Sequence, residues 1–117
     1  GSSWLLPRLV GLPRATQMMM LGEKISAEQA ADWGLIYKAV EDDALMAEAE
    51  ALAKRLASGP TVALGTMRKV LRGGLTQSYA DTLDAEAMGQ YLAGNSADAA
   101  EGIAAFLQKR KTEFKGK

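Results

Sequence analysis

The side chains of this chain that could do chemistry are carboxylates, lysines and tyrosines. Its 117 residues include no histidine and no cysteine. The commonest general base, the commonest zinc ligand and every Ser-His-Asp triad are therefore excluded. Disulfides, thiolate metal sites and cysteine nucleophiles are excluded as well. Acid–base chemistry within the chain would have to use carboxylates, Lys or Tyr.

The carboxylates form no pattern that is typical of a catalytic pair. A general acid or base needs a shifted pKa, and burial on an apolar helix face is one way to obtain it. No pair of carboxylates lies on such a face, so we predict that the acidic residues are solvated. This prediction covers ten of the 14 acidic residues: Asp32, Glu41, Asp42, Asp43, Glu48, Glu50, Asp81, Asp84, Glu86 and Asp98. We expect no catalytic residue and no metal site in the chain.

Basic residues crowd the C-terminal end of the chain. They are Lys109, Arg110, Lys111, Lys115 and Lys117, offset by Glu113. One interpretation is a cationic helix end that complements the helix macrodipole. A second is phosphate recognition, in which a lysine acts as a point charge. A third, nucleic-acid binding, needs a wider basic face with stacking aromatics, and 14 basic against 14 acidic residues argue against it.

The elements that carry these residues are predicted to be helices. Ala and Leu dominate a composition that is 48% apolar, and both favour helices. Capping, breaking and periodic residues predict helices from Ser2 or Ser3 to Val10, Pro13 to Gly22, Ser26 to Gly34, Asp42 or Asp43 to Ser58, Pro60 to Arg72, Thr76 or Ser78 to Gly94, and Ser96 to about Lys111. Residues 35–40 are the only extended candidate. We therefore predict an all-α chain of six or seven short helices.

Apolar spacing gives two further expectations. The helix that holds residues 18–21 is apolar on several faces and should be buried on several. The last helix should bury a stripe that includes Ile103, Phe106 and Leu107, with a loose tail after Lys111. No apolar run approaches the roughly 20 residues that span a bilayer, and no signal peptide is visible. We expect a cytoplasmic protein without a membrane partner.

Three segments of the chain carry distinctive motifs. They are SWLLPRLVG at residues 3–11, LGEKISAEQA with WGLI at residues 21–30 and 33–36, and EGIAAFLQKR at residues 101–110. In this order they resemble the crotonase superfamily of enoyl-CoA hydratases and isomerases. The first looks like the helix that follows the active-site loop, the second like the family's segment around I-S-A and G-L-V, and the third like its EG-x-x-A-F-x-x-K-R ending.

The resemblance implies that the chain is the C-terminal helical part of a longer enzyme. The ββα spiral domain of such an enzyme, absent from this chain, would bind an acyl-CoA thioester. Its backbone N–H groups would stabilise the enolate, and carboxylates would move protons. These groups would precede Gly1, so the 117 residues alone would be inactive. The helical part would form a homo-oligomer, a trimer or a dimer of trimers. Coenzyme A belongs to the substrate, and no separate cofactor is implied.

Three residues of this chain are candidates for substrate binding by the resemblance. Lys109 matches a lysine that reaches the CoA nucleotide, commonly across a subunit boundary. Tyr91 lies near the place of an aromatic residue against the adenine. Trp4 would line the acyl pocket, although it could equally fill the core. The WLLPR wording favours isomerase-like members of phenylacetate degradation. The sequence leaves hydration and isomerisation open, and the alternative is a self-standing helical interaction module without catalysis.

Overall fold

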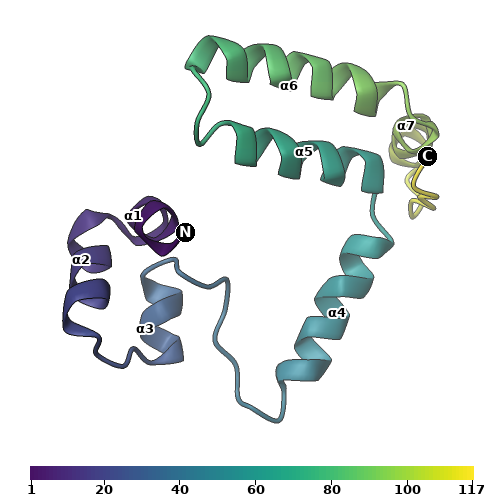
Figure 1. The fold of residues 1–117 in the computed structure, drawn as a ribbon. Helices are drawn as coiled ribbons and strands as arrows, with labels where there is room; N and C mark the ends of the chain where they lie inside the picture. Colours follow the sequence, from purple (N-terminus) through teal and green to yellow (C-terminus); the bar gives the residue numbers. More distant parts are fainter. The chain divides into compact units, whose positions relative to one another are not determined.

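The computed structural model describes all 117 residues as helices and connecting segments, without strands. The helices are α1 (Ser2–Val10), α2 (Leu12–Leu21), α3 (Ala27–Asp32), α4 (Leu45–Ala57), α5 (Thr61–Gly73), α6 (Tyr79–Gly94) and α7 (Ala97–Gln108) (Figure 1). The chain divides into two compact units, residues 1–45 and residues 46–117. The prediction of an all-α chain is confirmed, and no helix is long and apolar enough to cross a membrane.

The first unit is built on two short helices that meet at a glycine. α1 packs on α2, and Gly11 between them has a φ of 81° that an L side chain rarely adopts. The predicted capping box opens α3: the Ser26 hydroxyl accepts from the Gln29 N–H, and the Gln29 side chain accepts from the Ser26 N–H. The buried apolar residues of this unit are Val10, Ala15 and Ala30.

The second unit contains a hairpin of two helices, followed by a third that crosses its end. α5 and α6 lie side by side, and α7 contacts α6 (Figure 1). The predicted caps are present, since Ser78 accepts from the Asp81 N–H and Ser96 from the Ala99 N–H. The hairpin helices lie close together at Gly89, where a Cβ would lie 2.7 Å from the Thr66 methyl carbon. Gly89 is buried for that reason.

Several local predictions are wrong. Residues 35–40 form bends and irregular chain instead of a strand. The N-cap of α1 is Gly1, without a side-chain cap, instead of Ser2 or Ser3. α4 begins at Leu45, after a turn, and not directly behind Asp42 or Asp43. α7 ends at Gln108, and the residues after it are held against the helix instead of being loose.

The predicted apolar faces exist, but they are not buried within their units. On α2, Met19, Met20 and Leu21 are exposed. On α7, Ile103, Leu107 and Phe106 are exposed, and the Phe106 side chain is 82% accessible. The buried apolar core of the second unit is Ala105 alone. The expectation that these stripes are buried is therefore wrong for each unit taken by itself.

A pair of glycine substitutions tests the close approach of α5 and α6. Gly89→Ala adds a methyl group against Thr66, a β-branched residue with a hydroxyl that donates to the Val62 carbonyl. Overpacking of about 1–3 kcal/mol should outweigh the helix-propensity gain of about 1 kcal/mol. Gly89→Ala should therefore lower the urea midpoint of the chain, followed by circular dichroism.

The matched control is Gly65→Ala on α5, where an added Cβ meets nothing within 4 Å. This substitution should raise the midpoint, because only the helix-propensity gain of about 1 kcal/mol remains. A midpoint raised equally by both substitutions, at equal protein concentration, would contradict the close helix contact at Gly89.

Candidate functional site

Lys109 ends α7 in a left-handed turn that glycine usually occupies. Its φ of 53° makes it the one non-glycine residue of the chain with a positive φ. The Lys109 N–H donates to the Phe106 carbonyl at 3.2 Å, and the Arg110 N–H to the Ala105 carbonyl at 3.0 Å. These two bonds form a Schellman motif. A side chain in this conformation costs about 1–2 kcal/mol, which glycine would avoid. An exposed lysine at such a position is therefore a candidate for function.

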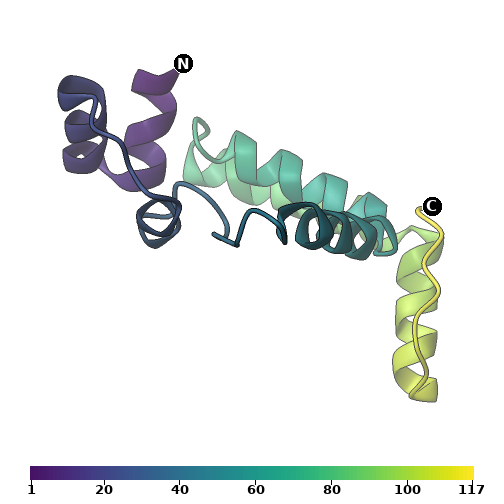
Figure 2. The same cartoon turned by 90° about the horizontal axis from the view of Figure 1, so that it is seen from below.

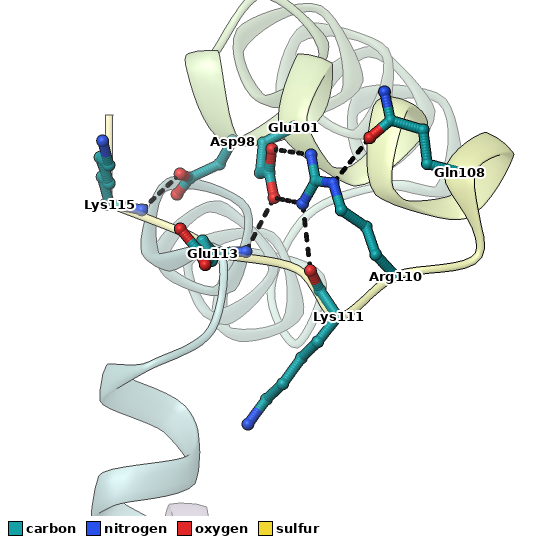
Figure 3. A network of polar contacts seen from close by, with 7 residues as sticks. All are labelled: Asp98, Glu101, Gln108, Arg110, Lys111, Glu113 and Lys115. Carbon is teal, nitrogen blue, oxygen red and sulfur yellow. Dashed lines mark hydrogen bonds and ion pairs between the residues drawn. The ribbon is translucent and has the colours of Figure 1, made fainter.

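An ion pair of two parallel hydrogen bonds lies directly behind this turn. Arg110 Nη1 and Nη2 donate to the two carboxylate oxygens of Glu101 at 2.6 and 2.8 Å (Figure 3). Arg110 Nε donates to Gln108 Oε1 at 2.8 Å. This forked geometry fixes the guanidinium more firmly than a single contact does. The side chains on both sides of Lys109 are thus linked to each other, and one of them is linked to the body of α7.

Residues 110–117, which we call the strap, run back along α7 (Figure 2). The buried Asp98, 2% exposed, accepts from the N–H groups of Lys115 at 2.6 Å and Gly116 at 2.8 Å. Its own N–H donates to the Lys117 carbonyl. The Glu101 carboxylate also accepts from the Glu113 N–H at 2.8 Å. The strap is therefore bound to the helix at both of its ends.

Asp98 and Glu101 are functional candidates that sequence reasoning missed. The prediction that Asp98 is a solvated charge is wrong, because the strap covers it. One signal was available in the sequence of the strap: Thr112 and Phe114 alternate with the charged residues Lys111, Glu113 and Lys115. In the structure both are half-buried, while these charged neighbours are exposed. Alternation of this kind is typical of an extended segment that lies on a surface. The Phe114 ring lies over Gly102, where a Cβ would be 3.6 Å from a ring carbon.

The Glu101 carboxyl group is strongly acidic. Its pKa falls from the ordinary 4.5 to about 2, mainly because of the hydrogen bonds from Arg110, then because of the Glu113 N–H. The charges of Arg110 and Lys115 act in the same direction. The same pairing raises the pKa of Arg110. Glu101 is therefore an anion over the whole physiological pH range, which suits it to holding a guanidinium and not to exchanging protons.

Of the three residues that the sequence proposed for substrate binding, Trp4 belongs to the first unit, and Tyr91 and Lys109 belong to the second. Trp4 is on α1, 39% exposed, with the Arg8 guanidinium 4.0 Å from the centre of its ring. Tyr91 is 67% exposed in the last turn of α6. Lys109 follows the opposite end of α7, which rises about 18 Å over its 12 residues. Within the second unit, the structure therefore does not bring Tyr91 and Lys109 together.

A groove in the second unit and a smaller pocket in the first unit include none of these three residues. A groove of about 450 Å³ lies between α5 and α6. It is lined by Ala63, Thr66, Met67, Val70, Leu71, Glu86, Gly89, Gln90 and Ala93. A pocket of about 70 Å³ in the first unit involves α2, α3 and the segment between them. No group of three or more acidic residues is arranged to hold a metal ion.

Comparison with known proteins defines the family. The enoyl-CoA hydratase/isomerase family model matches residues 1–117. The chain is 44% identical to 1,2-epoxyphenylacetyl-CoA isomerase of Escherichia coli, covering 100% of this chain and 45% of that protein. It is 34% identical to 2,3-dehydroadipyl-CoA hydratase of Escherichia coli, covering 100% of this chain and 46% of that protein.

A solved structure agrees with these relatives. The crystal structure of enoyl-CoA hydratase from Bacillus anthracis superposes with a TM-score of 0.93 at 29% identity, covering 100% of this chain and 45% of that one. The chain belongs to the enoyl-CoA hydratase/isomerase family, and it spans about half the length of the relatives that it matches.

The ionisation of Glu101 can be tested directly. Its folded pKa of about 2 lies below the ordinary 4.5. Its contribution to strap binding is therefore complete above pH 4.5 and is lost as the pH falls toward 2. The Glu101 carboxyl carbon, followed by NMR, should show a midpoint well below 4.5.

The control for this titration is Arg110→Gln, which removes the main cause of the shift. In that variant the Glu101 midpoint should move up toward its ordinary value. An ordinary midpoint in the unaltered chain would show that the Arg110–Glu101 pair does not persist in solution.

Proposed function

We propose that this chain is the helical C-terminal part of an enzyme that acts on acyl-CoA thioesters through a stabilised enolate. The family match along all 117 residues supports this assignment. The chain has no histidine and no cysteine, and the pKa values of Glu28 and Glu101 are lowered, away from neutral pH. These observations support the proposal that the catalytic groups lie outside the chain. The part described here would bind the CoA nucleotide and join subunits.

The observation that carries the binding proposal is the conformation of Lys109. An exposed lysine occupies a left-handed position that glycine would occupy at lower cost. No side chain of the chain pairs with its ammonium group in a salt bridge. The charge is therefore free to meet an anion, and the phosphates of CoA are anions that a lysine recognises as a point charge. Tyr91 is exposed on another helix. It would contact the same nucleotide either from a neighbouring subunit or at a different part of the nucleotide.

The joining of subunits is supported by the exposed apolar helix faces. Phe106, Leu107 and Ile103 lie on α7 with most of their surface accessible, and Met67 and Leu71 are exposed on α5. Contiguous apolar patches on a protein surface usually mark contact sites. We propose that they contact the remainder of the enzyme or neighbouring subunits in a trimer or a dimer of trimers. The alternative, a helical interaction module without catalysis, would use the same faces.

The acyl group is proposed to be hydrophobic or aromatic. A relative that is 44% identical is a 1,2-epoxyphenylacetyl-CoA isomerase, and Trp4 offers an aromatic wall on α1. The family also includes hydratases such as 2,3-dehydroadipyl-CoA hydratase. The choice between hydration and isomerisation depends on residues that this chain does not contain.

Substitution of Lys109 tests the binding role. The host is a chimaera in which this chain replaces the matching part of the 1,2-epoxyphenylacetyl-CoA isomerase. One screened lysine–phosphate contact contributes on the order of 1 kcal/mol, so Lys109→Ala should raise KM for acyl-CoA about five-fold. The kcat should stay nearly unchanged, because substrate and transition state lose the same contact. High salt should shrink the defect.

Two further variants separate binding from folding. Lys109→Gly should raise KM as much as Lys109→Ala does, yet stabilise the protein by about 1 kcal/mol because glycine tolerates the left-handed turn. Lys111→Ala, the same charge change two residues away, should leave KM nearly unaltered. A drop in kcat with KM intact, or no effect of Lys109→Ala at low salt, would refute the CoA contact.

The chain by itself should be catalytically inert. Purified 117-residue protein should not hydrate crotonyl-CoA above the uncatalysed rate, because the chain offers no histidine and no cysteine, and the pKa of Glu101 is shifted down, away from neutral pH. The chimaera serves as the positive control with its own substrate. Turnover by the 117 residues alone would place catalytic groups inside this chain and refute the proposal.

A further inference from the structure

We propose that Glu101 and Arg110 are positioning residues for Lys109. Their forked ion pair holds the left-handed turn that fixes the direction of the lysine side chain. This inference rests on the proposed contact between Lys109 and CoA. It extends that proposal to two residues that would act through Lys109 without touching the nucleotide themselves.

Lys109 lies between two residues whose side chains are held by hydrogen bonds. Arg110, the next residue, has its backbone N–H bound to the Ala105 carbonyl and its guanidinium bound to Glu101 (Figure 3). Gln108, the residue before, accepts from Arg110 Nε. The residues before and after Lys109 are therefore joined to each other by the hydrogen bond between the Arg110 and Gln108 side chains. The backbone of Lys109 is restrained, while its own side chain stays exposed.

The left-handed turn at Lys109 needs additional bonds to hold it. A non-glycine residue prefers the right-handed region, so an unrestrained Lys109 would leave the conformation seen here. The Schellman bonds alone are the common solution where glycine occupies this position. With lysine in its place, the additional tie from Arg110 to Glu101, nine residues earlier on α7, keeps the chain from unwinding at the helix end.

Arg110 and Lys109 differ in how their charges are paired. Arg110 is neutralised by Glu101 at 2.6 Å, whereas Lys109 has no acidic partner in a salt bridge. The arginine therefore serves the turn and the lysine is left for an anion. The two roles predict that loss of the Glu101 charge changes substrate affinity in the direction opposite to that expected from net charge alone. Loss of the Glu101 charge would by itself favour a polyanionic substrate, but loss of the Glu101–Arg110 tie should weaken its binding.

The test uses Glu101→Gln in the same chimaera. The positioning role predicts that KM for acyl-CoA rises about three-fold, less than for Lys109→Ala because the ammonium is still present, with kcat unchanged. The matched control is Glu113→Gln. It removes the same charge from a carboxylate that makes no hydrogen bond to Arg110, so KM should stay level or fall slightly. Unchanged or lower KM in Glu101→Gln would overturn the proposal.

A double-mutant cycle separates positioning from general stabilisation of the strap. In the Lys109→Ala background, Glu101→Gln should cause no further rise in KM, because the group that it positions is gone. The same rise in both backgrounds would overturn the positioning role. Hydrogen exchange of the chimaera supplies a readout that is independent of CoA: the Arg110 amide should exchange faster in Glu101→Gln and not in Glu113→Gln.

The cycle also distinguishes the two proposals from each other. If Lys109→Ala raises KM and Glu101→Gln does not, the CoA contact stands and the positioning role is wrong. If Lys109→Ala leaves KM unchanged at low salt, the CoA contact itself is wrong and the positioning role falls with it.

Discussion

The burial of apolar helix faces is the constraint on which the rest of this structure depends. Short helices are marginal in water, and most of their stability in proteins comes from packing an amphipathic face. Within the second unit, α6 contacts α5 and α7, and Ala105 is the buried apolar residue. Side chains as large as Phe106, Leu107 and Leu71 remain exposed. A further surface is needed to cover them, in keeping with a family of proteins about twice as long.

Hydrogen bonds from caps and from the strap hold the helix ends within the chain itself. Ser26, Ser78 and Ser96 cap the helices that follow them, and the strap closes α7 at its two ends through Asp98 and Glu101. The cap bonds join residues three apart, whereas the strap bonds join residues 12 to 18 apart. Neither set depends on a large apolar core. They explain how an exposed helix end can present Lys109 in one defined conformation. The exposed apolar surface is thus the part that we propose to join the chain to the rest of the enzyme, and the polar strap shapes the proposed binding end.

How much the sequence predicts depends on how local the cause is. The caps and breakers predict seven helices to within a few residues, because Ser, Pro and Gly act on their own neighbours. The family follows from three ordered motifs. Residues 35–40 are not a strand because no second segment is present to pair with them. The burial of Asp98 was not predictable from helix periodicity, since it depends on a tail 17 residues further along. The turn at Lys109 was missed because glycine, not lysine, is its usual signal.

The size of the 117-residue chain in solution tests the central claim most directly. If the exposed faces of α5, α6 and α7 are made to be covered by another surface, then the isolated chain should associate as its concentration rises. It should also bind a dye that recognises apolar surface. Light scattering over a wide concentration range, with dye fluorescence measured on the same samples, gives both results. A monomer at every concentration, with no dye binding, would contradict this account of the chain.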